Sequence, residues 1–342
     1  MSETKHAKIV KGISTSILFD MSEPARVYDE QGPAAYIDYM AKNADEPLPL
    51  GPYFKQLKSA FNAHSDFMEV VICSRNSPLT ARRAINTLTQ NGITPERMIF
   101  TSGKSPVPFL KAYGILQFHT TNLQDAQDAM AEGIQPMYHD PQAQKQAKVI
   151  ALNKSDHENV ISLSEHKASI LKEKYNGQAH WHYVFDLDGV VFDQEGEKYF
   201  QEAVKDFGFE KGLQKYRDYM RQLKQSPMKA GPAFNTLKTA ADINSRYAGK
   251  QKPLILSIVT AQGAEAAIRA IETLHAWGIE FNGSAHFLAG GPKQEILRIM
   301  QQQSEIAGVP CEFADDQAKN IEQAKYAGMF AGRVLGFGLE NS

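Results

Sequence analysis

The chain has 342 residues and a formal net charge of −2, with 37 Lys and Arg against 39 Asp and Glu. A hydrophobic content of 42% and a charged content of 22% are typical of a globular protein with one large domain or two. The near-neutral charge argues against nucleic-acid binding through a general basic field, and no apolar stretch is long enough to predict a membrane span. Two cysteines exclude a disulfide framework, so we expect a cytoplasmic protein without nucleic-acid or membrane partners.

Strands and helices are predicted to alternate along the first half. The run SILFD ends in Asp20 and predicts a strand, and residues 22 to 45, rich in Tyr and charge, predict a helical cap segment. A second strand, VVICS, precedes a helix that contains AINTLTQNGI. This alternation predicts a parallel, doubly wound sheet.

The second half repeats these segments in the same order. SILFDMSEP around Asp20 matches YVFDLDGVV around Asp186, and EPLPLGPYFKQLK matches SPMKAGPAFNTLK. VVICSRNSP aligns with LSIVTAQGA, and FTSGKSPVPFLKAYG with FLAGGPKQEILRIMQ. General α/β periodicity explains similar helices but does not explain the shared GP-x-F-x-x-LK, so we predict an internal duplication.

Two carboxylates follow an apolar run in HYVFDLDGVVFD, at Asp186 and Asp188. The pattern places them at the carboxyl end of a strand, where open α/β sheets bind ligands, and their spacing directs both side chains to one side. One carboxylate can act as a nucleophile and the other can transfer a proton, while Mg²⁺ keeps the pair ionised. A solvated Asp-x-Asp-Gly turn explains this motif alone equally well.

Three later segments also end in polar groups. LILSIVTAQG contains Thr260, whose hydroxyl can donate to a phosphoryl oxygen or cap a helix. FLAGGPK ends in Lys293, which can neutralise a phosphoryl group or be a solvated charge. CEFADDQ contains Asp315 and Asp316, a pair that is costly unless a cation or solvent accompanies it. In this order the segments predict one site for phosphoryl transfer.

The ordered set over residues 182 to 317 resembles the haloacid dehalogenase superfamily of phosphatases. A wider set resembles the cytosolic 5′-nucleotidase I family over most of residues 10 to 335: FDMSEPARVYDEQG, EPLPLGPYF, SRNSP, ITPERMIFTSGKSP, FLKAY, VTAQ, WGIEF, FLAGGPK and FADDQ. This resemblance implies Mg²⁺-dependent hydrolysis of nucleoside 5′-monophosphates in the cytosol, and it leaves a homo-oligomer open. The chain departs from the family where FDLDGVVFDQE replaces the expected FDGDAVLFSDE, and at Gln262, where the family tends to carry Arg.

The resemblance also implies roles for the site residues. Asp186 would attack phosphorus and form an aspartyl phosphate, and Asp188 would protonate the leaving oxygen and then activate water. Thr260 and Lys293 would orient and neutralise the phosphoryl oxygens. Mg²⁺ would be held by the carboxylates of Asp186, Asp315 and Asp316 and by the backbone carbonyl of Asp188. The alternatives are a phosphatase of another small phosphorylated metabolite, a phosphotransferase that passes phosphate to a nucleoside, and a non-catalytic nucleotide-binding protein.

The expected architecture is a doubly wound haloacid dehalogenase-like core at residues 180 to 342, with a helical cap at about 194 to 250. A connector at 138 to 179 would join it to a degenerate duplicated half at 1 to 137.

In this first half Asp20 takes the nucleophile position, Ser22 replaces the acid and base, and Pro106 aligns with Lys293. No Asp-Asp pair follows, so we expect this half to pack against the active one and shape the nucleoside pocket. The candidates for substrate contact are polar residues at its strand ends, with solvated turns as the alternative: Ser74, Arg75, Asn76 and Lys104.

Overall fold

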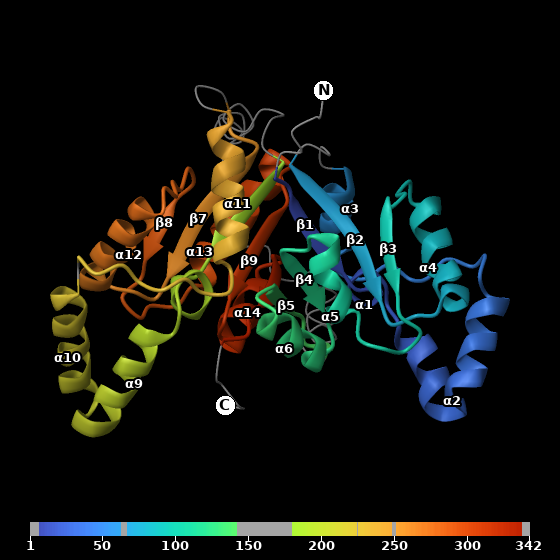
Figure 1. The fold of residues 1–342 in the computed structure, drawn as a ribbon, viewed down its shortest axis with the longest axis horizontal. Coiled ribbons are helices and arrows are strands. Elements are labelled where there is room, and N and C mark those ends of the chain that lie inside the picture. The colour runs from blue at the N-terminus through green and yellow to red at the C-terminus, as the bar shows by residue number, and fades with distance from the viewer. Residues whose placement is uncertain (1–6, 63–66, 142–179, 224, 248–250, 337–342) are drawn as a thin grey trace, which may run out of the picture. The chain divides into compact units, whose positions relative to one another are not determined.

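A computed structural model describes residues 7 to 62, 67 to 141, 180 to 223, 225 to 247 and 251 to 336 (Figure 1). The chain divides into two compact units, residues 1 to 144 and 145 to 342. Most of the predicted connector, residues 142 to 179, lies outside the described ranges. Within those ranges, no helix combines the length and the apolar character needed to cross a membrane.

The first unit contains a parallel sheet with the strand order β3-β2-β1-β4-β5. The bounds of its strands are β1 Ile9–Ile13, β2 Met68–Ser74, β3 Arg97–Phe100, β4 Gln117–Thr120 and β5 Gln135–Tyr138. Its helices are α1 Thr15–Leu18, α2 Ser22–Lys42, α3 Phe54–Asn62, α4 Pro78–Gln90, α5 Val107–Leu110, a 3₁₀ turn at Lys111–Tyr113 and α6 Leu123–Ala131. The helix α2 is interrupted at Gly32.

The second unit contains a parallel sheet with the strand order β8-β7-β6-β9-β10. Its strands are β6 Trp181–Phe185, β7 Leu254–Thr260, β8 Ala285–Phe287, β9 Cys311–Asp315 and β10 Phe330–Arg333. Its helices are α9 Glu195–Phe207, α10 Phe209–Gln222, α11 Phe234–Ser245, α12 Ala264–Ala276, α13 Gln294–Ala307 and α14 Ala318–Tyr326. The predicted α/β class with a parallel sheet is confirmed.

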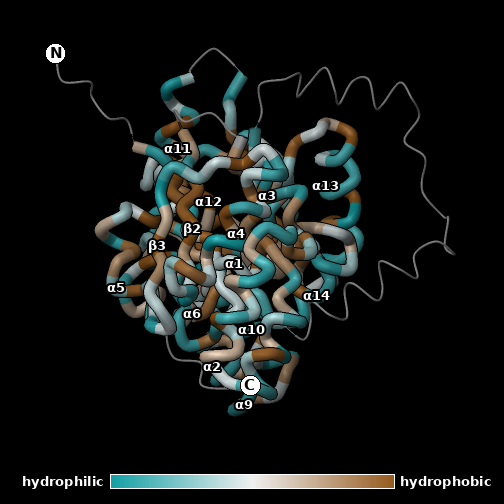
Figure 2. The backbone as a smooth tube through the Cα atoms, turned by 90° about the vertical axis from the view of Figure 1, so that its right-hand side faces the viewer, coloured by the Kyte–Doolittle hydropathy of each residue, from teal (hydrophilic) through white to brown (hydrophobic). Residues whose placement is uncertain are grey.

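Burial explains why the strands are continuous apolar runs. All seven residues of β7 and all five residues of β6 are buried, as expected for strands whose two faces are both covered by helices. Figure 2 shows the complementary pattern, in which β2 is strongly hydrophobic whereas α13 alternates between hydrophobic and hydrophilic residues. The core of the second unit is centred on Val184, Val259 and Phe313.

The helices α9 and α10 form a hairpin that extends away from the sheet of the second unit (Figure 1). The rings of Tyr199 and Tyr219 stack between them with their centroids 4.0 Å apart. The hairpin ends at Gln222, short of the expected cap boundary at about residue 250, because α11 packs on β7 and buries its apolar face there. The helix α11 therefore belongs to the core layer.

The Gly-Pro pair shared by the two halves has a steric reason. A Cβ atom at Gly51 would lie 2.8 Å from the carbonyl oxygen of Ile17, and one at Gly231 would lie 2.3 Å from that of Phe192. In each unit the backbone that follows the first strand passes directly over this glycine, so no side chain fits. The two units also have corresponding strand orders, and together the two features support the predicted duplication.

Candidate active site

The turn that follows β6 positions the first two carboxylates. Asp186 comes directly after the strand and is 4% exposed, and the chain then turns through Gly189, whose φ is 72°. A Cβ at Gly189 would lie 2.4 Å from Oδ2 of Asp316. Glycine is required here for two reasons, the left-handed backbone conformation and the close approach of a second carboxylate.

Three buried carboxylates converge beside this turn. Asp186, Asp315 and Asp316 offer ligand atoms that all lie within 4.8 Å of one another. Lys293 lies between two of them, with its Nζ 2.9 Å from Oδ1 of Asp186 and 2.7 Å from Oδ2 of Asp315. The sequence placed these four residues at separate strand and helix ends, and the structure brings them together.

Asp315 and Asp316 have different surroundings. Asp315 also accepts hydrogen bonds from the side chain of Asn320, at 3.0 and 3.1 Å, and from the backbone N–H of Gln317 at 2.8 Å. The carboxylate of Asp316 accepts a hydrogen bond of 3.3 Å from Gln194, through Oδ2. Its Oδ1 is buried and has no hydrogen-bond partner among the described residues. A carboxylate oxygen left in this way suits a cation, and an all-oxygen ligand set suits a hard divalent ion.

The ionisation of these groups reflects their burial. Burial raises the pKa of Asp186 to about 6, although the charge of Lys293 opposes this shift. Burial and the charge of Asp315 raise the pKa of Asp316 to about 7. Burial alone would lower the pKa of Lys293, but Asp186 and Asp315 outweigh it and the pKa is raised. The lysine is therefore charged at neutral pH, and the carboxylates share more negative charge than it compensates.

Asp188 lies apart from this cluster, at a cavity between the cap and the core of the second unit. Burial, together with the charge of Asp186, raises its pKa to about 7. Both of its carboxylate oxygens lie 2.9 Å from Nε2 of Gln262. The cavity has a volume of about 170 Å³, and its lining includes Ala261 and Gly263 from the core and a group of cap residues: Phe200, Phe209, Leu213, Tyr216 and Arg217.

Thr260 and Lys293 lie where the sequence predicted. Thr260 is the last residue of β7, is buried, and its Oγ1 accepts a hydrogen bond of 3.3 Å from the backbone N–H of Gln262. Lys293 immediately precedes α13 and is buried with the carboxylates. Both therefore belong to the same end of the parallel sheet as Asp186.

Backbone hydrogen bonds identify the equivalent position in the first unit. The N–H of Ser14 bonds to β4, and the N–H of Asp186 bonds to the equivalent strand β9. The carboxylates of Asp20 and Asp193 each accept the N–H two residues later, at 3.0 and 3.1 Å. Asp20 is thus equivalent to Asp193, and Ser14 takes the nucleophile position. The match of Asp20 with Asp186 is wrong. The second half contains two apolar runs that end in aspartate, YVFD at Asp186 and VVFD at Asp193, and the sequence alignment used the first of them.

Hydroxyls replace the carboxylates throughout the first unit's site. Ser16, equivalent to Asp188, has its Oγ 2.8 Å from that of Ser14 and 2.7 Å from Oγ1 of Thr121. Thr120 ends β4 as Asp315 ends β9, so Thr121 takes the place of Asp316. These residues offer no carboxylate to a metal.

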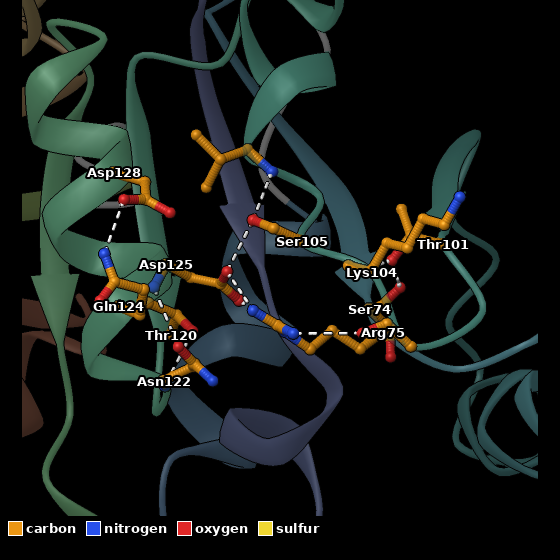
Figure 3. Close-up of polar contacts among 12 residues, drawn as sticks. Ser74, Arg75, Thr101, Lys104, Ser105, Thr120, Asn122, Gln124, Asp125 and Asp128 are labelled. Atoms are coloured by element: carbon orange, nitrogen blue, oxygen red, sulfur yellow. Dashed lines mark hydrogen bonds and ion pairs between the residues drawn. The ribbon is translucent and has the colours of Figure 1, made fainter.

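The four substrate-contact candidates lie in the first unit, and Figure 3 shows three of them, Ser74, Arg75 and Lys104. Arg75 forms two hydrogen bonds, of 3.0 and 2.6 Å, with Asp125, while Lys104 is exposed and extends away from that pair. Ser74 Oγ lies 3.0 Å from Oγ1 of Thr15. Asn76 accepts a hydrogen bond of 2.8 Å from the hydroxyl of Tyr36. Their contact with a substrate stays a prediction.

Several site residues had no signal in the sequence. Gln194 and Asn320 bond to the Asp-Asp pair, but an isolated amide in a polar segment predicts only a surface position. Gln262 bonds to Asp188, and the sequence marked it only as a departure from the family. Tyr216 and its aromatic neighbours on the cap also line the cavity, although the sequence singled out none of them.

Comparison with known proteins shows the family of the chain. The model of the 5′-nucleotidase family matches residues 1 to 150 and 141 to 341. Human cytosolic 5′-nucleotidase 1B is 25% identical over 338 residues, which cover 94% of this chain and 48% of that protein. The chain therefore spans about half the length of this relative.

Two solved structures each align with 47% of this chain. One is a haloacid dehalogenase family enzyme of Bacteroides thetaiotaomicron in complex with magnesium and inorganic phosphate, with 17% identity, 97% of that chain covered and a TM-score of 0.28. The other is a candidate β-phosphoglucomutase of Thermotoga maritima, with 16% identity, 88% covered and a TM-score of 0.32. These scores are too low to support a conclusion, whereas the family model covers nearly the whole sequence. The chain belongs to the 5′-nucleotidase family.

Proposed function

We propose that this protein hydrolyses nucleoside 5′-monophosphates to nucleoside and phosphate in the cytoplasm, through an aspartyl phosphate on Asp186. The observation that carries the proposal is the buried cluster of Asp186, Asp315 and Asp316 with Lys293 between two of its members. Such an arrangement in a chain of the 5′-nucleotidase family supports phosphoryl transfer, which depends mainly on positioning and charge stabilisation.

Mg²⁺ is the cation that the site would hold. Asp186 and Asp316 are the carboxylates proposed as direct ligands, because Oδ1 of Asp316 has no partner among the described residues whereas Asp315 is held by Lys293 and Asn320. The backbone carbonyl of Asp188 would complete the protein's share of the ligands. When bound, the ion supplies positive charge that screens the phosphate from the carboxylates.

The side chains divide the chemical work. A carboxylate oxygen of Asp186 attacks phosphorus as the bond to the 5′ oxygen breaks, and Asp188 donates its proton to that oxygen. In the second step Asp188 takes a proton from a water molecule, whose oxygen attacks phosphorus and releases Asp186. The raised pKa of Asp188, about 7, is suited to both transfers near neutral pH. Lys293 and Thr260 neutralise and orient the phosphoryl oxygens.

The leaving nucleoside would occupy the cavity beside Asp188. This cavity is lined on the cap side by aromatic residues, among them Phe200, Phe209 and Tyr216. A base has a π face that can stack on such rings. In this proposal the first unit does not hydrolyse phosphate, because its own site consists of hydroxyls.

Phosphate release from a panel of nucleoside 5′-monophosphates and sugar phosphates tests the proposal. We expect Mg²⁺-dependent release from the nucleotides, reversible loss in excess chelator, and no turnover by Asp186→Asn, because an amide cannot form the acyl phosphate. Circular dichroism would verify that this near-isosteric variant is folded. Activity of Asp186→Asn above a few per cent of wild type, or full activity in chelator, would contradict the mechanism.

A further inference from the structure

The surroundings of Asp188 point to a residue that acts through it. We infer that Gln262 is a positioning residue, which holds the Asp188 carboxyl in the orientation needed for proton transfer to the leaving oxygen. This inference rests on the proposed function, since it assumes that Asp188 is the proton donor.

The contact between the two side chains is symmetric. Nε2 of Gln262 lies 2.9 Å from each carboxylate oxygen of Asp188. An ionised carboxylate only accepts hydrogen bonds, and a carboxyl that carries a proton on one oxygen still accepts on the other. The amide nitrogen of Gln262 can therefore bond to Asp188 in both protonation states. A donor shared equally between the two oxygens opposes rotation of the carboxyl group about its terminal bond, which is otherwise a soft torsion.

Burial and backbone hydrogen bonds fix Gln262, whereas its amide oxygen has no hydrogen-bond partner among the described residues. It is 4% exposed, its backbone N–H donates to Oγ1 of Thr260 at 3.3 Å, and its backbone carbonyl accepts from the N–H of Ala289 at 3.1 Å. The residue is thus tied to the ends of two neighbouring segments of the core. Because Gln262 and Asp188 both line the cavity, the orientation is fixed where a leaving group would enter.

The first unit provides a comparison within the same chain. Asn76 is equivalent to Gln262, since the N–H of each donates to the hydroxyl that ends the preceding strand. Where Gln262 faces a carboxylate, Asn76 has Ser16 in the corresponding position, and its amide oxygen accepts from the hydroxyl of Tyr36. The contact between an amide and a carboxylate thus occurs in the unit that has the acidic cluster.

A leaving-group comparison separates positioning from a merely structural role. A nucleoside 5′-alkoxide needs a proton as it leaves, whereas the p-nitrophenolate of p-nitrophenyl phosphate leaves without one. In single-turnover measurements with Mg²⁺, we expect Gln262→Met to slow cleavage of a nucleoside monophosphate about 10- to 100-fold. Formation of nitrophenolate should stay within about twofold of wild type.

Gln301→Met is the matched control, because Gln301 is also a buried glutamine but lies on α13 and donates to Glu305. It should behave as wild type with both substrates. If Gln262→Met is unfolded by circular dichroism, Gln262→Glu keeps the shape of the side chain and places a carboxylate against Asp188. The same selective loss is then expected.

Equal slowing of both substrates would overturn the inference and assign Gln262 a structural role, and unchanged rates with both would also overturn it. Failure of the proposed function looks different. In that case the wild-type protein would cleave p-nitrophenyl phosphate but no nucleoside monophosphate.

Discussion

At the scale of single residues, burial sets the charge state of the site. The pKa of Asp186 is raised to about 6 and those of Asp188 and Asp316 to about 7, from an ordinary value of 3.8. At pH values between about 4 and 7, these carboxyl groups are ionised in the unfolded chain, whereas in the native protein without a metal they still hold protons. These three carboxyl groups therefore lower the free energy of unfolding as the pH rises through this range. The buried His119 and His182, whose pKa values burial lowers, act in the opposite direction below about pH 6.5 and reduce this fall.

We predict this pH dependence for the protein in excess chelator. The melting temperature should be lower at about pH 8 than at about pH 5. Asp188→Asn removes one of the responsible groups, so it should reduce the difference and melt above wild type at the higher pH. Differential scanning calorimetry at both pH values measures this, with the exposed Asp206→Asn as a control that should follow wild type. A melting temperature of Asp188→Asn below that of wild type at the higher pH would show that burial of the charge is not destabilising.

At the scale of elements, the hairpin of α9 and α10 decides what surrounds the leaving group. The ring of Phe200 makes edge contacts with those of Phe209 and Tyr216, with centroids 6.3 and 5.5 Å apart. All three residues line the cavity, and Phe209 is exposed. The hairpin therefore presents an aromatic surface to a site whose proposed catalytic groups all come from the core.

This surface leads to a prediction about nucleotide affinity. Phe209→Ala should raise the KM for a nucleoside monophosphate about tenfold, since stacking of a base on a ring contributes about 1–3 kcal/mol. Its kcat should change little, and the KM for ribose 5-phosphate, which has no base, should not change. Phe109→Ala removes an exposed phenylalanine of the first unit and is the control in the same steady-state assay. A parallel rise for both substrates would exclude base stacking.

At the scale of the whole molecule, two units of corresponding strand order differ in chemistry. The second has the acidic cluster and Asp188, whereas the first has only hydroxyls in the equivalent places, those of Ser14, Thr120, Thr121 and Ser16. A hydroxyl without a neighbouring base is a weak nucleophile, and these groups cannot hold a metal as carboxylates do. Only the second unit should become phosphorylated.

Titration with beryllium fluoride, a mimic of the phosphoryl group, tests this asymmetry. With Mg²⁺ we expect one equivalent to bind per chain, and none to bind to Asp186→Asn. Asp20→Asn should retain the chemical step, because Asp20 is equivalent to Asp193 and holds a backbone N–H. Two equivalents per chain, or binding that survives in Asp186→Asn, would show that the first unit is a working site.

The sequence by itself determined the class of fold and the ends of the strands that bear the site. Buried apolar runs that stop at Asp186, Thr260 and Asp315 are local patterns, and parallel strands bring such ends to one edge of the sheet. The tertiary structure decided that Asp316, rather than Asp315, has an oxygen free of partners among the described residues, and that Gln262 holds Asp188. It also decided which residues of the two halves are equivalent, since Asp20 corresponds to Asp193 and not to Asp186. These facts depend on contacts between residues far apart in the chain, and a local pattern cannot distinguish two apolar runs that both end in aspartate.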